Sequence, residues 1–231
     1  MKVFIGGSKN ICSLPDVAKA YLRYLIDIRA KILVGDCGGA DCAVQRFFTS
    51  ANYQNVTVYY SGEKARNSVG NHTQVNVVSD EIAGTFEYHR SKDIKMELEC
   101  DIGFMIWDGI SKGTLQNIID LTAIRKRVFV CVNGIISEYS RIDVANLLLK
   151  DKSAVNIWLD DSRDAPRNFI RTRSVYETEM LIECAEKLGV KIVKIDCDHD
   201  LGQYETLGGN GFNLIDWLTE QKLFYPVNMR L

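Results

Sequence analysis

Residues 104–117 read FMIWDGISKGTLQN, and the rest of the chain repeats their pattern. An apolar run over residues 102–107 ends in a small polar turn, and apolar residues with helical spacing follow from residue 115. This order predicts a strand, a loop and a helix. A glycine in such a turn lets a ligand approach the backbone, and the unpaired amides of a helix start attract an anion such as phosphate. The candidate phosphate-binding residues here are Ser111, Lys112, Gly113 and Thr114, although an ordinary strand-to-helix turn has the same composition.

The composition allows one large core or two small ones, because 46% of the 231 residues are apolar. The net charge of −2 gives no electrostatic footprint for nucleic acid or for an anionic membrane, so neither is an expected partner. No apolar run reaches the ~20 residues of a membrane span, and no signal segment is recognisable at the start. We expect a cytoplasmic protein.

The seven cysteines are an odd number and lie scattered along the chain. This usage is typical of a reducing compartment rather than of a disulfide framework. Cys37 and Cys42 are the closest pair, but no C-x-x-C motif or paired histidine accompanies them, so we expect no structural zinc site.

Two earlier segments repeat the succession of strand, glycine turn and helix. A β-branched run over residues 2–5 precedes a helical pattern over 15–28, and a second run over 32–34 precedes a helical pattern over 43–48. Strands that alternate with helices predict an α/β fold with a parallel sheet covered on both faces. Ligands of such sheets bind beyond the carboxyl ends of the strands, so three glycine turns at that edge favour a phosphate-bearing ligand. The additional candidate residues are Gly6, Gly7, Ser8, Gly35, Gly38, Gly39 and Asp41.

Four short motifs give the first part a family resemblance. They are GGSKN at 6–10, GDCGGADCA at 35–43, RSKDIKM at 90–96 and DGISKGT at 108–114. In this order and spacing, residues 1–135 resemble the SLOG superfamily, a Rossmann-like nucleotide-binding group that includes the cytokinin-activating phosphoribohydrolases. The resemblance implies binding of a nucleotide or an ADP-ribose-like molecule. It aligns Lys92 with a family arginine, with Arg90 as a nearby substitute, and it suggests a homodimer through the helix after Thr114.

One departure from the family concerns catalysis. The phosphoribohydrolases have the pattern P-G-G-x-G-T followed shortly by a glutamate, whereas this chain has Gln116 and Asn117 after Thr114. An amide cannot act as a general base or stabilise positive charge developing on a ribose. We therefore expect the first part to bind its ligand without cleaving it. Asp36 or Asp41 is a possible replacement acid, but an aspartate beside glycines also serves as a turn or cap residue.

The boundary between the two parts is predicted near residue 153. Residues 142–149 have a helical pattern that we expect to close the first domain, and residues 150–153 are polar enough for a linker. The predicted domains are therefore 1–153, a nucleotide-binding domain, and 154–231, a smaller domain.

Two acidic clusters follow strands of the second part. A strand over 155–159 leads into DDSRDAP, and a strand over 190–195 leads into DCDHDLG. In a parallel sheet both clusters lie at one edge, and strand alternation would turn His199 away from its two neighbouring aspartates. Gathered carboxylates repel unless a cation bridges them, and oxygen ligands suit Mg²⁺ or Mn²⁺. Acids at strand ends are also common as caps. The predicted metal ligands are Asp160, Asp161, Asp198 and Asp200.

WLDDSRDAP at 158–166 and DHDLG at 198–202 resemble the cyclic-phosphate-processing receiver-like domain, a relative of response-regulator receivers. The resemblance spans 155–231 and implies action on cyclic phosphates of nucleosides or of ADP-ribose. By position, the four aspartates would hold the metal, Arg163 would meet phosphate and His199 would be an acid or base. The family continues beyond the last strand with a His-Ser-x-Asn-Pro segment, so we expect a shortened domain.

These interpretations predict a two-domain α/β protein, a Rossmann-like domain followed by a receiver-like one. It would bind a nucleotide-derived small molecule and hydrolyse a phosphoester with metal assistance. Two alternatives stay open: a non-catalytic sensor of a nucleotide signal, and a nucleotide N-glycosidase of the phosphoribohydrolase type.

Overall fold

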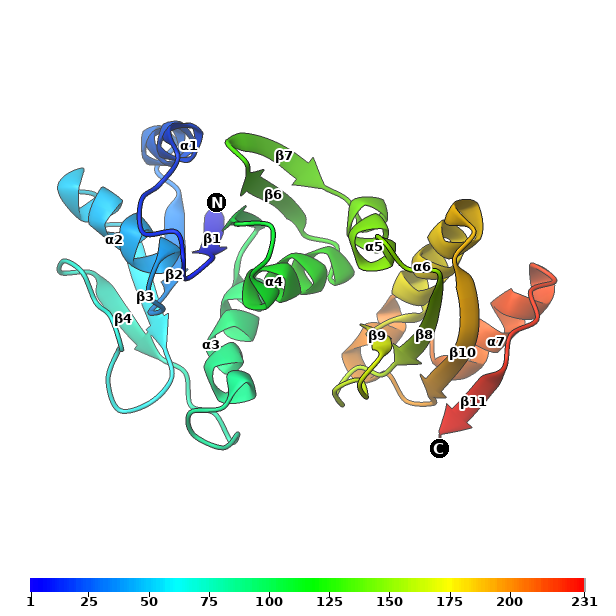
Figure 1. Ribbon diagram of the computed structural model, residues 1–231. Coiled ribbons are helices and arrows are strands. Elements are labelled where there is room, and N and C mark those ends of the chain that lie inside the picture. Colours follow the sequence, from blue (N-terminus) through cyan, green and yellow to red (C-terminus); the bar gives the residue numbers. More distant parts are fainter. Residues whose placement is uncertain (231) are drawn as a thin grey trace. The chain divides into compact units, whose positions relative to one another are not determined.

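The computed structural model describes residues 1–230, which form two compact α/β units (Figure 1). Unit 1 spans Met1–Tyr139, and unit 2 begins at Ser140. Within residues 1–230, none of the helices is both long enough and apolar enough to pass through a lipid bilayer.

Unit 1 contains a seven-stranded sheet in the order β4-β3-β2-β1-β5-β6-β7. All neighbours are parallel except β6 and β7. The central strands are buried along almost their whole length because helices cover both faces, which confirms the α/β prediction. The strands are β1 (Lys2–Gly7), β2 (Lys31–Gly35), β3 (Val56–Tyr60), β4 (Thr73–Asn76), β5 (Ile102–Ile106), β6 (Arg127–Val132) and β7 (Ile135–Tyr139).

Four helices cover this sheet: α1 (Asp16–Asp27), α2 (Ala40–Ser50), α3 (Phe86–Glu99) and α4 (Lys112–Ala123). The apolar residues of α1 and α2 share one core with alternate strand residues such as Val3, Ile5 and Phe104. Helices α3 and α4 contact the central strands as well. Helix α4 is buried over most of the stretch from Thr114 to Ala123, although we expected the helix after Thr114 to be an exposed dimer face.

Strands β2, β1 and β5 are adjacent and parallel, so their carboxyl ends lie side by side. The turn after β1, the turn after β2 and the turn before α4 therefore meet at one edge of the sheet, as the sequence pattern predicted. This edge holds the first candidate site.

Strands β4 and β7 were not predicted. Strand β4 is short, lies at the sheet edge and has mostly exposed residues, so it lacks an apolar pattern. Strand β7 pairs antiparallel with β6 through Asn133 and Gly134, both of which have positive φ. An Asn-Gly pair between two strands is a recognised hairpin signal, which the sequence interpretation missed.

Unit 2 opens with helix α5 (Arg141–Leu149), whose start has a capping box between Ser140 and Asp143. Helix α5 packs on α6 (Val175–Leu188) of the same unit. The division between the units therefore precedes the helix that we expected to close the first domain, and it lies before the boundary predicted near residue 153.

The sheet of unit 2 has four parallel strands in the order β11-β10-β8-β9. They are β8 (Ala154–Leu159), β9 (Phe169–Thr172), β10 (Lys191–Asp198) and β11 (Val227–Arg230), with the 3₁₀ helix η1 (Gly202–Thr206) and helix α7 (Gly211–Glu220) between the last two. Strand β9 was not predicted. Because Leu159 pairs with Cys197 in adjacent strands, the acidic segments after β8 and at the end of β10 meet at one edge.

Candidate functional sites

An acidic cluster lies at the carboxyl edge of the unit 2 sheet. One carboxylate oxygen from each of Asp160, Asp161 and Asp198 lies within 4.8 Å of the others. Asp160 follows β8, whereas Asp198 is the last residue of β10. Asp160 and Asp198 are buried, and Asp161 is half-buried. Three clustered hard oxygen donors fit a divalent cation such as Mg²⁺ or Mn²⁺.

Asp160 is held by several donors. Its Oδ1 accepts hydrogen bonds from the backbone amides of Ser162 at 3.1 Å and Arg163 at 2.6 Å. Its Oδ2 lies 2.8 Å from Nε of Arg163 and 3.1 Å from Nη1 of Arg230. Burial acts to raise the pKa of Asp160, but the amides of Arg163 and Ser162 and the arginine charges hold it below its ordinary value. Asp160 is therefore a firmly ionised anchor.

Arg163 bridges two members of the cluster, because its Nη2 also reaches Oδ2 of Asp198 at 2.5 Å. Its side chain is 57% exposed, so solvent or a ligand can reach the guanidinium. No lysine or arginine of the described residues lies within ion-pair distance of Asp161, and burial together with the charge of Asp160 raises the pKa of Asp161. The cluster thus combines two carboxylates that are paired with arginine and one carboxylate, Asp161, whose negative charge a cation would stabilise.

In the described chain, neither Asp200 nor His199 is a member of this group, although His199 directly follows Asp198. Strand β10 ends at Asp198, so the strand alternation that we predicted does not continue to Asp200. Asp200 is exposed, and its Oδ1 accepts a hydrogen bond from the amide of Gly202 at 2.8 Å. The His199 ring packs edge-on against Phe212 with centroids 5.1 Å apart.

Arg230 belongs to the site but was not predicted. It lies on β11, where it is paired with Asp198 in register, and its guanidinium stacks 3.5 Å from the centre of the Trp158 ring. No local sequence motif marks this arginine, because only the pairing of β11 with β10 brings it to the cluster.

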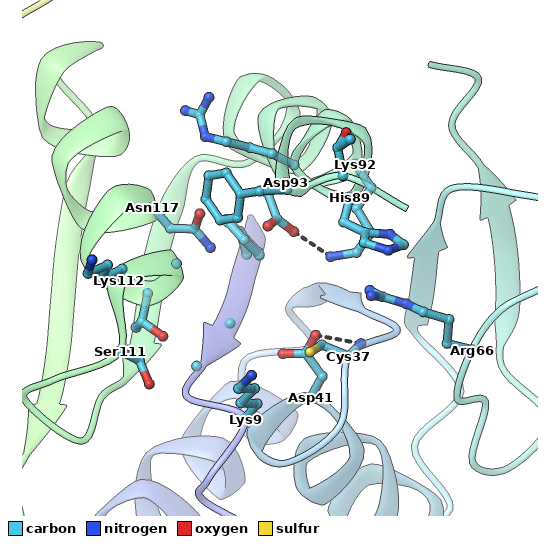
Figure 2. A pocket seen from close by; sticks show the side chains of 18 of the residues that line it. Lys9, Cys37, Asp41, Arg66, His89, Lys92, Asp93, Ser111, Lys112 and Asn117 are labelled. Atoms are coloured by element: carbon cyan, nitrogen blue, oxygen red, sulfur yellow. Dashed lines mark hydrogen bonds and ion pairs between the residues drawn. The ribbon is translucent and has the colours of Figure 1, made fainter. Parts of the chain in front are cut away.

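The second candidate site is a pocket of about 460 Å³ in unit 1 (Figure 2). It lies at the carboxyl edge of the sheet, between the turns after β1 and β2 and the first turns of α3 and α4. Pockets that bind small molecules have volumes of about 300–1,000 Å³. Of the predicted residues, the pocket is lined by Gly6, Gly7, Asp41, Arg90, Lys92, Ser111, Lys112, Gly113 and Thr114.

The other predicted residues, Ser8, Gly35, Gly38 and Gly39, are not part of the lining. Ser8 is buried, and its Oγ accepts a hydrogen bond from the amide of Asp108 at 3.0 Å. A Cβ on Gly35 would lie 2.5 Å from Oδ2 of Asp41 and 2.7 Å from Nζ of Lys92. Gly39 has a φ of 71°, and a Cβ there would overlap the backbone of Lys9. Both glycines are therefore required by the packing of the chain itself.

The two predicted phosphate-binding cations of α3 are already paired. Arg90 pairs with Asp120. Lys92 is buried, and its Nζ lies 2.5 Å from Asp93 and 4.0 Å from Asp36. Burial opposes the charge of Lys92, yet Asp93 and Asp41 hold its pKa above the ordinary value.

Other cationic groups face the pocket without a partner. In the described chain the ammonium groups of Lys9 and Lys112 have no carboxylate within ion-pair distance, and both residues line the pocket. The N-cap residue of α4, Ser111, makes no side-chain capping hydrogen bond. The first amides of α4 are therefore available to an anion.

Asn117 lines the pocket one turn into α4, whereas the neighbouring Gln116 donates to Asp120 at 3.0 Å. Figure 2 shows the Asn117 amide directed toward the middle of the pocket. Of the two amides that follow Thr114, Asn117 thus faces the pocket. Further lining residues that the sequence interpretation did not single out for this site are Lys9, Cys37, Arg66, Phe86, His89, Asp93 and Asn117.

The two sheets and their acidic and glycine-rich edges define a Rossmann-like α/β unit followed by a receiver-like α/β unit. Residues 155–230 match the family model of the cyclic-phosphate processing receiver domain. This match agrees with the resemblance inferred from the two acidic motifs and links unit 2 to cyclic phosphate processing. No curated protein and no solved structure matches the chain significantly. The resemblance of residues 1–135 to the SLOG superfamily stays a prediction.

Proposed function

We propose that the protein binds a nucleotide-derived ligand in the unit 1 pocket and hydrolyses a cyclic phosphoester at the acidic edge of unit 2. The observation that carries the proposal is the group of three carboxylates, Asp160, Asp161 and Asp198, in the segment that matches the cyclic-phosphate processing family.

Asp160, Asp161 and Asp198 would hold Mg²⁺ or Mn²⁺. When bound, such an ion acts as a Lewis acid and lowers the pKa of water. Arg163 is exposed, so its guanidinium is free to turn from Asp198 to a phosphate, which it would bind through two parallel hydrogen bonds. Arg230, stacked on Trp158, stays on Asp160 and keeps that carboxylate oriented.

His199 is the candidate proton donor for the leaving oxygen. Its backbone amide donates to Oδ1 of Asp198 at 3.0 Å, which fixes the residue beside the cluster. Its ring is half-buried against Phe212 and retains nitrogen atoms for a substrate.

The test is hydrolysis of nucleoside 2′,3′-cyclic phosphates and of ADP-ribose cyclic phosphate with Mg²⁺ or Mn²⁺, followed by mass spectrometry of the phosphomonoester. Asp161→Asn should lower the rate by at least about 100-fold, because even outer-shell changes cost roughly 10–100-fold. Asp216→Asn, an exposed carboxylate of α7, is the matched control. Equal rates for the two variants would contradict the proposal.

A second candidate function is a sensor that binds a nucleotide signal without cleaving it. Asn117 favours this function, because it offers the pocket an amide where the phosphoribohydrolases have a carboxylate. Calorimetry with ADP-ribose, paired with mass spectrometry of the mixture, should show binding without a product. Release of a free base from a nucleoside monophosphate would instead support an N-glycosidase.

A further inference from the structure

The two walls of the unit 1 pocket differ in their charged groups. The start of α4 contributes its N-cap residue Ser111 and Lys112, which has no ion-pair partner in the described chain, whereas Lys9 packs against Gly39 on the α2 side (Figure 2). Across the pocket, α2 and α3 contribute the carboxylates of Asp41 and Asp93. The nucleotide-binding proposal uses only the first of these walls.

Three aspartates lie near Lys92, but their carboxylate oxygens accept different numbers of hydrogen bonds. Asp36 is fully buried, and it accepts from the backbone amide, Nε and Nη2 of Arg66 at 2.6–3.0 Å. Asp41 accepts only from the amide of Cys37 at 3.1 Å through Oδ2, and Asp93 accepts only from Lys92 through Oδ1. Each of these two pocket carboxylates therefore keeps one oxygen without a hydrogen-bond donor in the described chain.

Lys92 acts here as a positioning residue. Its Nζ lies beside Oδ2 of Asp41 over Gly35, where a Cβ would touch both atoms. The lysine charge and the Arg66 charge offset most of the charge of the three aspartates, so the wall needs no further cation. Carboxylates in this state accept hydrogen bonds from neutral donors, such as hydroxyl or amino groups.

An independent observation shows that the pocket is built for a polar ligand. Asn117 is 7% exposed, has no hydrogen-bond partner in the described chain and lines the same pocket. The amide atoms of Asn117 are not enclosed by protein, so they open into the pocket, where a ligand can supply their hydrogen bonds. Asn117 lies on α4, one turn after the anion-attracting helix start.

We infer that the pocket takes a phosphorylated sugar or nucleotide in one direction, with the phosphate at Lys112 and the first amides of α4 and with neutral hydrogen-bond donors at Asp41 and Asp93. The donors are ribose hydroxyls or an amino group of the base. This inference rests on the proposed function of unit 1 and adds the recognition of the end opposite the phosphate. Asn117 binds the middle of the ligand.

The experiment is calorimetric titration of the full chain with AMP, 2′-deoxy-AMP, IMP, ribose 5-phosphate and inorganic phosphate. AMP should bind more tightly than inorganic phosphate. Asp41→Asn and Asp93→Asn should each weaken AMP binding by about tenfold or more, since each replaces a carboxyl group with an amide, and should leave phosphate binding unchanged. Lys112→Ala should weaken the binding of all five ligands, because each of them contains a phosphate.

The exposed Asp27 of α1 provides the matched control, Asp27→Asn. If circular dichroism shows that Asp41→Asn does not fold, the inference is tested with Asp93→Asn alone. If 2′-deoxy-AMP binds more weakly than AMP and IMP does not, the donors are ribose hydroxyls. If IMP binds more weakly than AMP and 2′-deoxy-AMP does not, the donor is the amino group of the base. AMP binding that is unchanged in both aspartate variants overturns the inference and leaves the proposed function intact. Failure of every probe to bind removes the proposed nucleotide function itself.

Discussion

The carboxyl edges of both sheets gather three aspartates, but the cations that neutralise them differ. In unit 1 the neutralising Lys92 is buried and its charge is fixed between carboxylates. In unit 2 two arginines share this role: Arg163, whose side chain is 57% exposed, and Arg230, whose side chain is 20% exposed and pairs with Asp160. A buried cation is a permanent part of the fold, whereas an exposed one can be exchanged for a metal ion or a phosphate. The burial of the neutralising cation is therefore the feature that distinguishes the proposed hydrogen-bonding wall of unit 1 from the candidate metal site of unit 2.

The largest effect should come from Lys92→Met, which would leave three aspartates near one another without their central cation. Removing one partner of a buried ion pair typically costs about 3–5 kcal/mol. Denaturant unfolding should show this loss in the free energy of unfolding. Lys126→Met is a control for the loss of a partly exposed lysine that contacts only backbone carbonyls. Equal losses would show that Lys92 has no special role.

The second prediction concerns Mn²⁺ and unit 2. At a free concentration of 100 times Kd, a ligand that binds only the folded state stabilises it by about 2.7 kcal/mol. Mn²⁺ should therefore raise the thermal midpoint of the wild-type protein and of Asp216→Asn, but not that of Asp161→Asn. Stabilisation of Asp161→Asn by Mn²⁺ would place the ion elsewhere.

The pH dependence of stability should separate Asp41 from the other acids. Burial raises the pKa of Asp41 to about 7, above its value in the unfolded chain. Between about pH 4 and pH 7 the folded state then binds the extra proton, so the Asp41 contribution to stability falls as pH rises. Asp41→Asn removes this fall. Relative to wild type, the variant should gain roughly 2–3 kcal/mol between about pH 5 and pH 8, because each pH unit below the folded pKa corresponds to about 1.4 kcal/mol. Parallel stability curves would contradict the assignment.

The smallest effect on stability should come from Arg163→Met. The exposed guanidinium contributes little to folding, so the unfolding midpoint without metal should change little. Mn²⁺ should bind more tightly, because no arginine competes for Asp160 and Asp198, while turnover of a cyclic phosphate should fall. Weaker Mn²⁺ binding would show that Arg163 organises the carboxylates rather than competing for them.

The sequence predicted much of the fold because strand runs, glycine turns and helical spacing are local signals. It placed the three glycine turns at one edge and brought Asp160, Asp161 and Asp198 together. It could not show that Lys92 is enclosed by aspartates, because Asp36 and Asp41 come from the segment between β2 and α2, which is remote from Lys92 in the sequence. For the same reason Asn117 and Arg230 gained their places only from the packing of helix and strand.

Arg230 also makes the electrostatics of unit 2 depend on an edge strand. Strand β11 pairs with β10 alone, and edge strands open more readily than central ones. Each opening would withdraw Arg230 from Asp160, 70 residues earlier in the chain, and leave the cluster more negative. A divalent ion bound by the carboxylates would neutralise them in place of Arg230, so the free energy of opening β11 would fall. Amide hydrogen exchange along β11 should therefore become faster when the ion is bound.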